Sequence, residues 1–245
     1  MFASQKQPQQ SVQNIFDRIA RRYDLLNRVI SFHLDTFWRK KAIEALKGND
    51  GFVLDLGTGT GDLALTAARE IKGKIFGLDF SPEMLRLAQA KKNRLPYGER
   101  TVYILGSALA PPFKDEVFDA VITSFVLRNI PDLGLFFLQA YRLLRPGGRL
   151  VSLDMFPPSG SIFPFLYSFY FYRLVPWIGA GLARDRCAYQ YLSDSVRTFH
   201  PPETIAGIIR QKGFERVRIH KFLGGAVCLH IGEKPGFSTT QVKHP

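Results

Sequence analysis

Short apolar runs alternate with helical patterns along most of the chain, and each run predicts a buried strand. An uninterrupted apolar run suits a strand that is covered on both faces, as in a parallel sheet. Five such runs are followed by two more that form an antiparallel pair around Gly224 and Gly225. The pattern predicts an α/β fold with a seven-stranded, mostly parallel, doubly wound sheet that ends in an antiparallel hairpin. The expected strands are 52–54, 75–79, 101–105, 117–124, 149–154, 214–222 and 226–231.

Helix and turn signals fill the intervals between these strands. Ser81 offers a hydroxyl cap before Pro82 and Glu83, which predicts a helix that runs to about Lys92. Asp62 opens an earlier helix, and 133–144 and 189–197 carry later ones. A last helix begins at Pro201 and ends near Gly213, and 145–148, with one proline and two glycines, predicts a turn before the fifth strand.

The same pattern divides the chain into one domain with flanking segments. Residues 1–11 are polar and lack the apolar core of a signal peptide, so we expect a disordered lead-in. Ile15, Ile19 and Tyr23 recur at helical spacing, which predicts a helical cap over 12–47 within a domain that extends to 234. Residues 155–200 break the alternation and contain an aromatic segment, which predicts a lid or an interfacial element, and 235–245 is a loose tail.

Charge and cysteine content narrow the classes of partner. The 245 residues carry a formal net charge of +12, which favours contact with anions such as nucleic acid or an anionic membrane surface. Two cysteines, Cys187 and Cys228, are too few for a disulfide framework and fit a reducing compartment. Nothing in the sequence directs export, so we expect a cytoplasmic protein. The five histidines are scattered, and no spacing predicts a metal site.

A glycine-rich turn after the first strand is the main candidate for ligand binding. Gly57, Gly59 and Gly61 allow a sharp turn that brings backbone groups against a ligand. Asp79, eighteen positions after Gly61, ends the second strand, where a carboxylate accepts hydrogen bonds from ribose hydroxyls. A dinucleotide would place its pyrophosphate at the helix that Asp62 opens, and the Asp62 carboxylate would repel it. A ligand with a positive centre and no phosphate, S-adenosylmethionine, is therefore favoured over a dinucleotide and over a plain structural turn.

Several motifs resemble one family of enzymes. Segments 23–27, 31–32 and 38–39 resemble the amino-terminal signature of the ubiquinone/menaquinone biosynthesis C-methyltransferases. Later segments resemble its other signatures: 124–129, 141–148, 189–197, 212–215 and 224–227. The similarity extends from about residue 12 to residue 234. It implies a class I methyltransferase that uses S-adenosylmethionine to methylate a ring carbon of a polyprenylated quinol precursor, most simply demethylmenaquinol or the benzoquinol of the ubiquinone pathway.

The resemblance assigns roles in cofactor binding. It implies that Thr60 contacts the cofactor in the turn, that Asp79 binds the ribose, and that Ser124 lies beside the methionine moiety. Ser107 and Ala108 are expected near the adenine, and Asp55, Gly57 and Gly61 complete the predicted cofactor set.

The chain departs from the family pattern at some of these positions. The family usually has an acid or amide at Ser107, an acid at Leu109 and glycine at Val126, and usually polar residues at Trp177 and Cys187. A hydroxyl holds an adenine amino group less strongly than a carboxylate does. Val126 is expected to narrow the pocket.

Residues after the fourth strand are the candidates for chemistry on the ring. A carbon nucleophile requires an electron-rich ring, which is obtained by deprotonating the neighbouring phenol. Arg128 cannot be an ordinary base, because the pKa of a guanidinium exceeds about 12. It is expected to stabilise the phenolate directly or through a water, and the alternative for this residue is an ion pair at the surface. Asn129 and Tyr191 are the other catalytic candidates, and Tyr23, Asn27, Tyr189 and Arg197 are candidates for substrate contact.

Alternative functions and partners remain open at this point. A class I methyltransferase acting on another small aromatic or lipid-like acceptor would share all the cofactor residues. A nucleic-acid methyltransferase is disfavoured because 162–177 is apolar, whereas a nucleic-acid platform interleaves aromatic and basic residues. Phe163, Phe165, Phe169 and Trp177, with Arg173, form an expected wedge for peripheral contact with the inner face of an anionic membrane. The same aromatics could instead line the pocket or form a homodimer contact.

Overall fold

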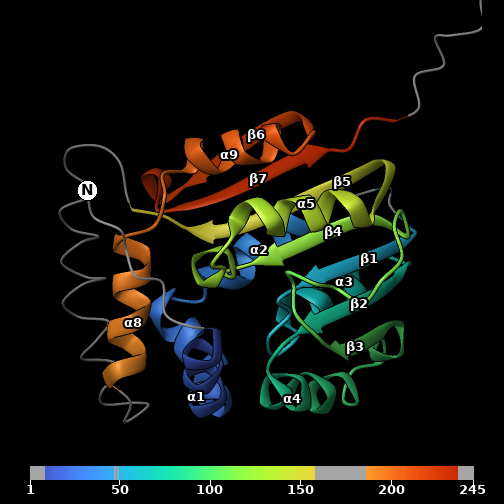
Figure 1. Ribbon diagram of the computed structural model, residues 1–245. Helices are drawn as coiled ribbons and strands as arrows, with labels where there is room; N and C mark the ends of the chain where they lie inside the picture. Colours follow the sequence, from blue (N-terminus) through green and yellow to red (C-terminus); the bar gives the residue numbers. More distant parts are fainter. Residues whose placement is uncertain (1–8, 47, 49, 158–185, 237–245) are drawn as a thin grey trace, which may run out of the picture.

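The computed structural model describes residues 9–46, 48, 50–157 and 186–236, and its centre is one seven-stranded sheet (Figure 1). The strand order is β3-β2-β1-β4-β5-β7-β6. Strand β7 is antiparallel to both β5 and β6, and the other neighbours are parallel, as the apolar pattern predicts. The strands are β1 Phe52–Leu56, β2 Lys74–Asp79, β3 Thr101–Leu105, β4 Phe118–Ser124, β5 Leu144–Met155, β6 Glu215–Phe222 and β7 Val227–Glu233.

Helices cover both faces of this sheet. One apolar core contains Leu54 and Leu56 with residues of α5 and α9, and the other contains Val53 with residues of α2 and α3. Successive residues of β1 therefore point into different cores, which explains why the run 52–56 is apolar at almost every position. The helices are α1 Gln9–Ile30, α2 Leu34–Glu44, α3 Asp62–Glu70, α4 Pro82–Lys92, α5 Leu133–Leu143, α8 Arg186–Arg197 and α9 Pro202–Gln211.

Local sequence signals account for where several helices begin. Ser81 caps α4, because its side chain accepts a hydrogen bond from the backbone N–H of Met84 at 3.1 Å, and Pro82 occupies the first turn. Asp132 caps α5 in the same way by accepting from the N–H of Leu135 at 2.8 Å. Both helices begin where the sequence predicts, at Pro82 and Leu133. The caps fix the ends of the loops that follow β2 and β4.

The structure corrects the sequence prediction at two places. Residues 145–148 do not form a separate turn, because β5 already begins at Leu144 and pairs there with Phe118. The register then shifts between Phe118 and Ala120, and this bulge accommodates the residues around Gly147, whose φ is 78°. Helix α1 begins at Gln9, inside the segment 1–11 that is expected to be disordered.

The amino-terminal helices lie beside the edge of the sheet where the parallel strands end. Helix α1 packs against α4 and also contacts α2 and α8 (Figure 1). The aromatic segment 162–177 lies outside the described residues. Within the described part of the chain, no helix combines the length and apolarity that a membrane crossing requires.

Candidate functional site

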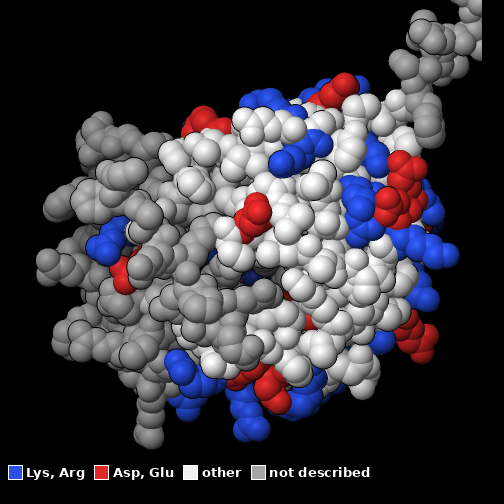
Figure 2. All heavy atoms as spheres, in the orientation of Figure 1, with Lys and Arg blue, Asp and Glu red and all other residues white. Residues whose placement is uncertain are grey.

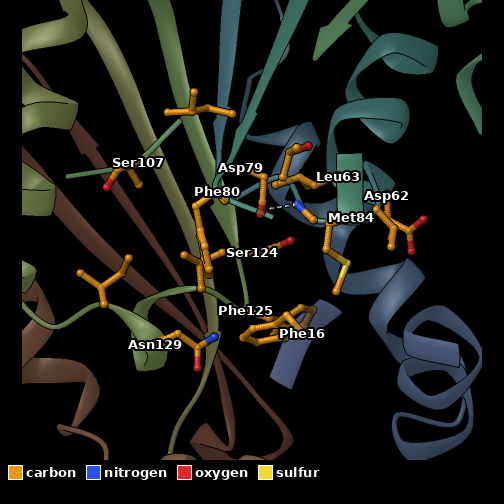
Figure 3. Close-up of a pocket in the computed structure, with 18 of the residues that line it drawn as sticks. Phe16, Asp62, Leu63, Asp79, Phe80, Met84, Ser107, Ser124, Phe125 and Asn129 are labelled. Carbon is orange, nitrogen blue, oxygen red and sulfur yellow. Dashed lines mark hydrogen bonds between the residues drawn. The ribbon is translucent and has the colours of Figure 1, made fainter. Parts of the chain in front are cut away.

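A pocket opens at the carboxyl ends of β1, β2 and β4 (Figure 3). Its walls come from the glycine turn, the residues after β2, β3 and β4, Phe16 and Tyr23 of α1, and Arg39 of α2. In Figure 3, Ser107 and Asp62 lie on opposite sides of it, with Asp79 between them and with Asn129 and Phe125 below. This is the place where open α/β sheets bind ligands.

The glycine turn is shaped by close contacts that a side chain would prevent. The backbone N–H groups of Gly57 and Thr58 both donate to the carbonyl of Leu78, at 2.8 and 3.0 Å. Gly57 has a φ of 75°, and a Cβ there would lie 2.6 Å from Val126 Cγ2. Gly61 has a φ of 82°, and a Cβ there would collide with the Tyr103 hydroxyl. Gly57 and Val126 are therefore packed together at the pocket wall, where Val126 departs from the family pattern.

Asp79 lines the pocket and fastens the turn. Its Oδ2 accepts from the N–H of Gly59 at 2.7 Å, the bond drawn in Figure 3, and its Oδ1 accepts from the N–H of Ser81 at 2.9 Å. Burial raises the pKa of this carboxyl, and the backbone donors counteract that shift. Each carboxylate oxygen has a further lone pair, so the side chain retains the capacity to accept hydrogen bonds from two ribose hydroxyls.

Asp55 supports the turn from below and does not line the pocket. Its Oδ2 accepts from the Thr58 hydroxyl at 2.7 Å, and its Oδ1 has no partner among the described residues. Burial raises the pKa of this carboxyl to about 7. Asp55 is therefore a buried acid beneath the turn.

Asp62 lies at the start of α3, and its charge is already compensated. Arg28 Nη2 approaches its Oδ2 at 2.7 Å, and Lys91 Nζ approaches its Oδ1 at 2.6 Å. Burial alone would raise the pKa of Asp62, but Arg39, Lys91 and Arg28 together lower it to about 2. The Asp62 carboxylate lies at the start of α3, as predicted. Its expected repulsion of a pyrophosphate assumed an unpaired negative charge, whereas Arg28 and Lys91 neutralise it.

The other predicted cofactor residues are brought together around the same pocket. Thr60, Ser107, Ala108 and Ser124 all line it. Thr60 Oγ1 donates to Asp24 Oδ1 at 2.5 Å and accepts from Lys91 Nζ at 3.0 Å. Ser107 Oγ accepts from the N–H of Leu109 at 3.2 Å, and Leu109 lines the pocket where the family usually has an acid.

The Arg128 side chain is buried behind the pocket wall in an ion pair whose acidic partner, Asp154, the sequence analysis did not identify. Its Nε donates to Asp154 Oδ1 at 2.7 Å, and its Nη1 lies 3.4 Å from the Ser195 hydroxyl. The Asp154 Oδ2 accepts from the N–H of Leu127 at 2.8 Å, which fixes the loop after β4. Arg128 is 4% exposed and does not line the pocket, so the alternative interpretation as an ion pair is correct in part, except that the pair is buried.

Asn129 and Tyr191 meet across this loop. Asn129 lines the pocket, and its Oδ1 accepts from the Tyr191 hydroxyl at 3.0 Å. Burial raises the pKa of Tyr191, and the charge of Arg128 lowers it. Two of the three predicted catalytic residues are therefore in direct contact, and the third acts on one of them electrostatically.

The four candidates for substrate contact are placed differently. Tyr23 lines the pocket, and Asn27 is one turn further along α1. Arg197 is 63% exposed and pairs with Asp194 at 2.9 Å on the surface of α8. Tyr189 belongs to α8, but its side chain lies outside the described residues. The structure thus brings Tyr23 to the pocket and leaves Arg197 at the surface.

Asp154 and Arg39 are not among the site residues that the sequence analysis selected, although each had a feature in the sequence that could have identified it. Asp154 is the last residue but one of β5, and Asp79 is the last residue of β2, so the rule for an acid at a strand's carboxyl end applied to Asp154 as well. Arg39 lies inside the motif Trp38–Arg39, and the structure shows it buried and lining the pocket. Arg28 and Lys91, which neutralise Asp62, carried no signal because their contacts join segments far apart in the sequence.

The pocket fits S-adenosylmethionine by the chemistry of its walls. Asp79 presents acceptors for ribose, and the apolar Leu109, Phe80 and Ile130 offer surfaces for an aromatic base. Two buried donors near Tyr23, Asn27 Nδ2 and Arg39 Nε, have no acceptor in the described part of the chain. The site thus combines the acceptor oxygens of Asp79 with two donors, Asn27 Nδ2 and Arg39 Nε, that have no acceptor among the described residues.

Comparison with known proteins identifies the class of fold. A SAM-dependent methyltransferase structure from Thermotoga maritima matches with a TM-score of 0.64 at 21% identity, covering 90% of this chain and 98% of that one. Phosphoethanolamine N-methyltransferase 2 of Haemonchus contortus, solved with S-adenosyl-L-methionine, matches with a TM-score of 0.57 at 19% identity, covering 80% of this chain and 52% of that one. At these identities the likeness establishes the class I methyltransferase fold alone.

Sequence relatives establish the family. A demethylmenaquinone methyltransferase of Thermus thermophilus is 40% identical over 223 residues, which cover 90% of this chain and all of the relative. A ubiquinone/menaquinone biosynthesis C-methyltransferase UbiE of Geotalea uraniireducens is 38% identical over 92% of this chain and 97% of the relative. The model of the ubiE/COQ5 methyltransferase family matches residues 4–234. The chain therefore belongs to the ubiE/COQ5 methyltransferase family and is an S-adenosylmethionine-dependent methyltransferase.

Proposed function

We propose that this enzyme methylates a ring carbon of a polyprenylated quinol, converting demethylmenaquinol to menaquinol or acting on the benzoquinol of the ubiquinone pathway. The activities named for the relatives support this substrate class. The observation that carries the proposal is the buried Arg128, which Asp154 holds behind the wall that Asn129 forms. A fixed positive charge at this place suits a substrate that becomes a phenolate.

Two tyrosines show how the charge of Arg128 acts on a phenol in this region. Tyr23 and Tyr191 are both half-buried, and this partial burial raises the pKa of each. The charge of Arg128 lowers both pKa values. A quinol hydroxyl in the same pocket is subject to both effects: burial disfavours its ionised form, and the positive charge of Arg128 offsets part of that cost, so its ionisation depends on Arg128. The carbon next to that oxygen then becomes the nucleophile.

The remaining task of the protein is alignment. S-adenosylmethionine supplies an already activated methyl group, so the side chains must orient the ring and exclude water. Positioning of this kind is worth roughly 7–11 kcal/mol. Asn129, which accepts from the Tyr191 hydroxyl at 3.0 Å, orients a ring hydroxyl, and Tyr23 of α1 contributes to the wall of the same pocket. Arg197 pairs with Asp194 on an exposed face and receives no role on the ring.

Quinone analysis of a strain that lacks the protein tests the substrate class. We expect quinones without the ring methyl group to accumulate, and the wild-type gene to restore the methylated form. Complementation with Arg128→Lys should restore little. An unchanged quinone pool would favour the alternative, a methyltransferase for another small aromatic or lipid-like acceptor.

We also propose that the enzyme works at a membrane surface, where a polyprenyl tail resides. The α1–α2 corner consists of Phe32, Leu34 and Phe37, whose exposed fractions are 71%, 37% and 46%. Phe32 and His33 have φ angles of 51° and 63°, and this left-handed turn holds Phe32 outward. Lys41 Nζ lies 5.7 Å from the centroid of the Phe37 ring, so a cationic group lies beside these apolar side chains, as in proteins that rest on anionic bilayers.

Charge on the rest of the molecule is distributed differently. Figure 2 shows one face on which basic and acidic side chains are interspersed around the rim and the centre is largely uncharged. A nucleic-acid groove would show a continuous basic track instead. On this face, the charge pattern does not favour a nucleic-acid partner.

Vesicle flotation tests the membrane proposal. We expect the protein to float with anionic vesicles at low salt, and Phe32→Ser/Phe37→Ser to reduce the bound fraction. Leu138→Ser on α5 is the matched control, because Leu138 is 47% exposed but lies away from the corner. Equal binding by both variants, or no binding by the wild type, would refute this role. A change from dimer to monomer in the double variant would show that the corner is a homodimer contact instead.

A further inference from the structure

A polar cluster at the α1–α2 side of the pocket contains donors without acceptors. Arg39 is 4% exposed, and its Nε–H has no partner among the described residues. The amide nitrogen of Asn27 is also buried and without a partner there. Both groups lie near the Tyr23 hydroxyl. Burial raises the pKa of Tyr23, and Asn27 and the charge of Arg39 lower it. Buried donors nearly always have acceptors, so two unused donors indicate an absent one.

Arg39 is also distinguished by its charge. Among the described residues that line the pocket, it is the single lysine or arginine. The Asp35 carboxylate accepts from its Nη1, and the guanidinium lies 5.1 Å from the centroid of the Phe125 ring. These contacts fix the guanidinium at the pocket wall and occupy Nη1, but they leave Nε unused. Arginine presents its N–H groups as a planar fork that matches a carboxylate.

The position of the cluster indicates which part of the cofactor it meets. Asp79 provides the ribose acceptors, and Ser107 and Ala108 lie beyond it on the side expected for the adenine. Asp62 marks the opposite side of the pocket in Figure 3, and Arg39 Nη1 lies 3.9 Å from Asp62 Oδ2, so a ligand that extends from Asp79 away from Ser107 approaches Arg39. In S-adenosylmethionine that end is the amino acid, which carries a carboxylate.

We propose that Arg39, assisted by the amide of Asn27, binds the α-carboxylate of S-adenosylmethionine. The inference depends on the cofactor and not on the quinol substrate, so it survives if the acceptor is a different molecule. The competing interpretation is structural: Arg39 would serve only to neutralise Asp35 and to hold α2 in place. Arg28 offers a comparison, since it pairs with Asp35 and Asp62 but does not line the pocket.

Calorimetry with two ligands separates these interpretations. S-adenosylhomocysteine has the carboxylate, whereas 5′-methylthioadenosine has the same adenosine and sulfur but lacks the amino acid. We expect Arg39→Gln to weaken S-adenosylhomocysteine binding by roughly 10- to 100-fold, the loss of a charge-assisted hydrogen-bonded pair. Binding of 5′-methylthioadenosine should be unchanged. Asn27→Ala should show the same selectivity with a smaller loss.

Two further variants make the outcome decisive. Arg28→Gln removes a charge from the same network outside the pocket, and we expect it to affect both ligands equally and weakly. Arg39→Lys keeps the charge but loses the Nε–H, and should give an intermediate, carboxylate-selective loss if Arg39→Gln folds poorly. Equal weakening of both ligands by the Arg39 variants would establish the structural role. Unchanged affinity for S-adenosylhomocysteine would overturn the proposal as well.

Discussion

The two halves of the pocket are built on different principles. The half at β1 and β2 is a backbone structure: Gly57 and Thr58 donate to Leu78, and Gly59 donates to Asp79. The half after β4 is held by side chains: Asn129 lines the pocket and accepts from Tyr191 of α8, and the Arg128–Asp154 pair supports the wall from behind. A backbone site accepts a ligand of constant shape, such as a cofactor. A side-chain site can be adjusted to an acceptor, and its integrity depends on distant parts of the chain.

The largest effect is expected from breaking the buried pair in the side-chain half. Asp154→Asn leaves Arg128 buried without its counter-charge, and should lower the free energy of unfolding by about 3–5 kcal/mol. Urea denaturation measures the change. Arg86→Gln, which breaks the half-exposed Glu83–Arg86 pair, is the control and should cost less than about 1 kcal/mol. Similar losses in the two variants would mean that the Arg128–Asp154 pair contributes no special stability.

Arg128→Lys separates catalysis from cofactor binding. Lysine keeps the positive charge for Asp154 but loses the planar fork. We expect turnover to fall roughly 10²-fold, because the lysine ammonium cannot reproduce both the bond to Asp154 and the contact with Ser195, and the positive charge behind Asn129 is misplaced. Affinity for S-adenosylhomocysteine, measured by calorimetry, should stay near the wild-type value. If the affinity for S-adenosylhomocysteine and the turnover fall together, Arg128 contributes to cofactor binding, and the pocket does not divide into a cofactor half and an acceptor half.

The buried acid beneath the glycine turn makes a pH-dependent contribution to stability. The pKa of Asp55 is about 7 in the folded protein, against 3.8 as its ordinary value. The folded state therefore binds this proton more tightly, and the associated stability is present at low pH and is lost as the pH rises through 7. Between about pH 5 and 8 the loss should amount to roughly 2–3 kcal/mol. Unfolding titrations of Asp55→Asn should show a flatter pH profile, and an identical profile would exclude Asp55 as its source.

Asp79→Asn probes the cofactor half alone. The amide retains an acceptor but loses the charge that strengthens bonds from ribose hydroxyls, so affinity for S-adenosylhomocysteine should fall by about 1.5–3 kcal/mol. Asp115→Asn changes an acid at the surface and serves as the control. Turnover of the saturated Asp79→Asn enzyme should stay close to that of the wild type. Unchanged affinity would remove Asp79 from the ribose site.

The smallest effect is expected from Tyr191→Phe. This variant removes one hydrogen bond to Asn129, worth about 0.5–1.5 kcal/mol. We expect kcat/KM for the acceptor to fall by a few-fold, with no change in cofactor affinity. Because Tyr191 is on α8 and Asn129 follows β4, this result would show that α8 helps to build the acceptor half. An effect on cofactor affinity would show that the two halves are not separate.

The contrast between the halves also explains what the sequence could predict. The seven strands, the cap at Ser81 and the glycine turn follow local rules, and the sequence predicts all three correctly. The buried pairing of Arg128 with Asp154 joins positions 26 residues apart, and the Asn129–Tyr191 contact spans 62 residues. Tertiary contacts of this kind leave no periodic pattern in the chain. The resemblance to a known family selected Arg128, but its buried partner became visible only in the fold.

Methyl transfer from a donor with a deuterated methyl group tests the proposed reaction on the purified enzyme. The protein is incubated with a short-chain demethylmenaquinol under reducing conditions, and the product is examined by mass spectrometry and NMR. We predict one deuterated methyl group on the ring carbon next to a hydroxyl, with one S-adenosylhomocysteine formed per methyl transferred. Deuterium on a quinol oxygen, or cofactor binding without any transfer to the quinol ring, would contradict the function proposed here.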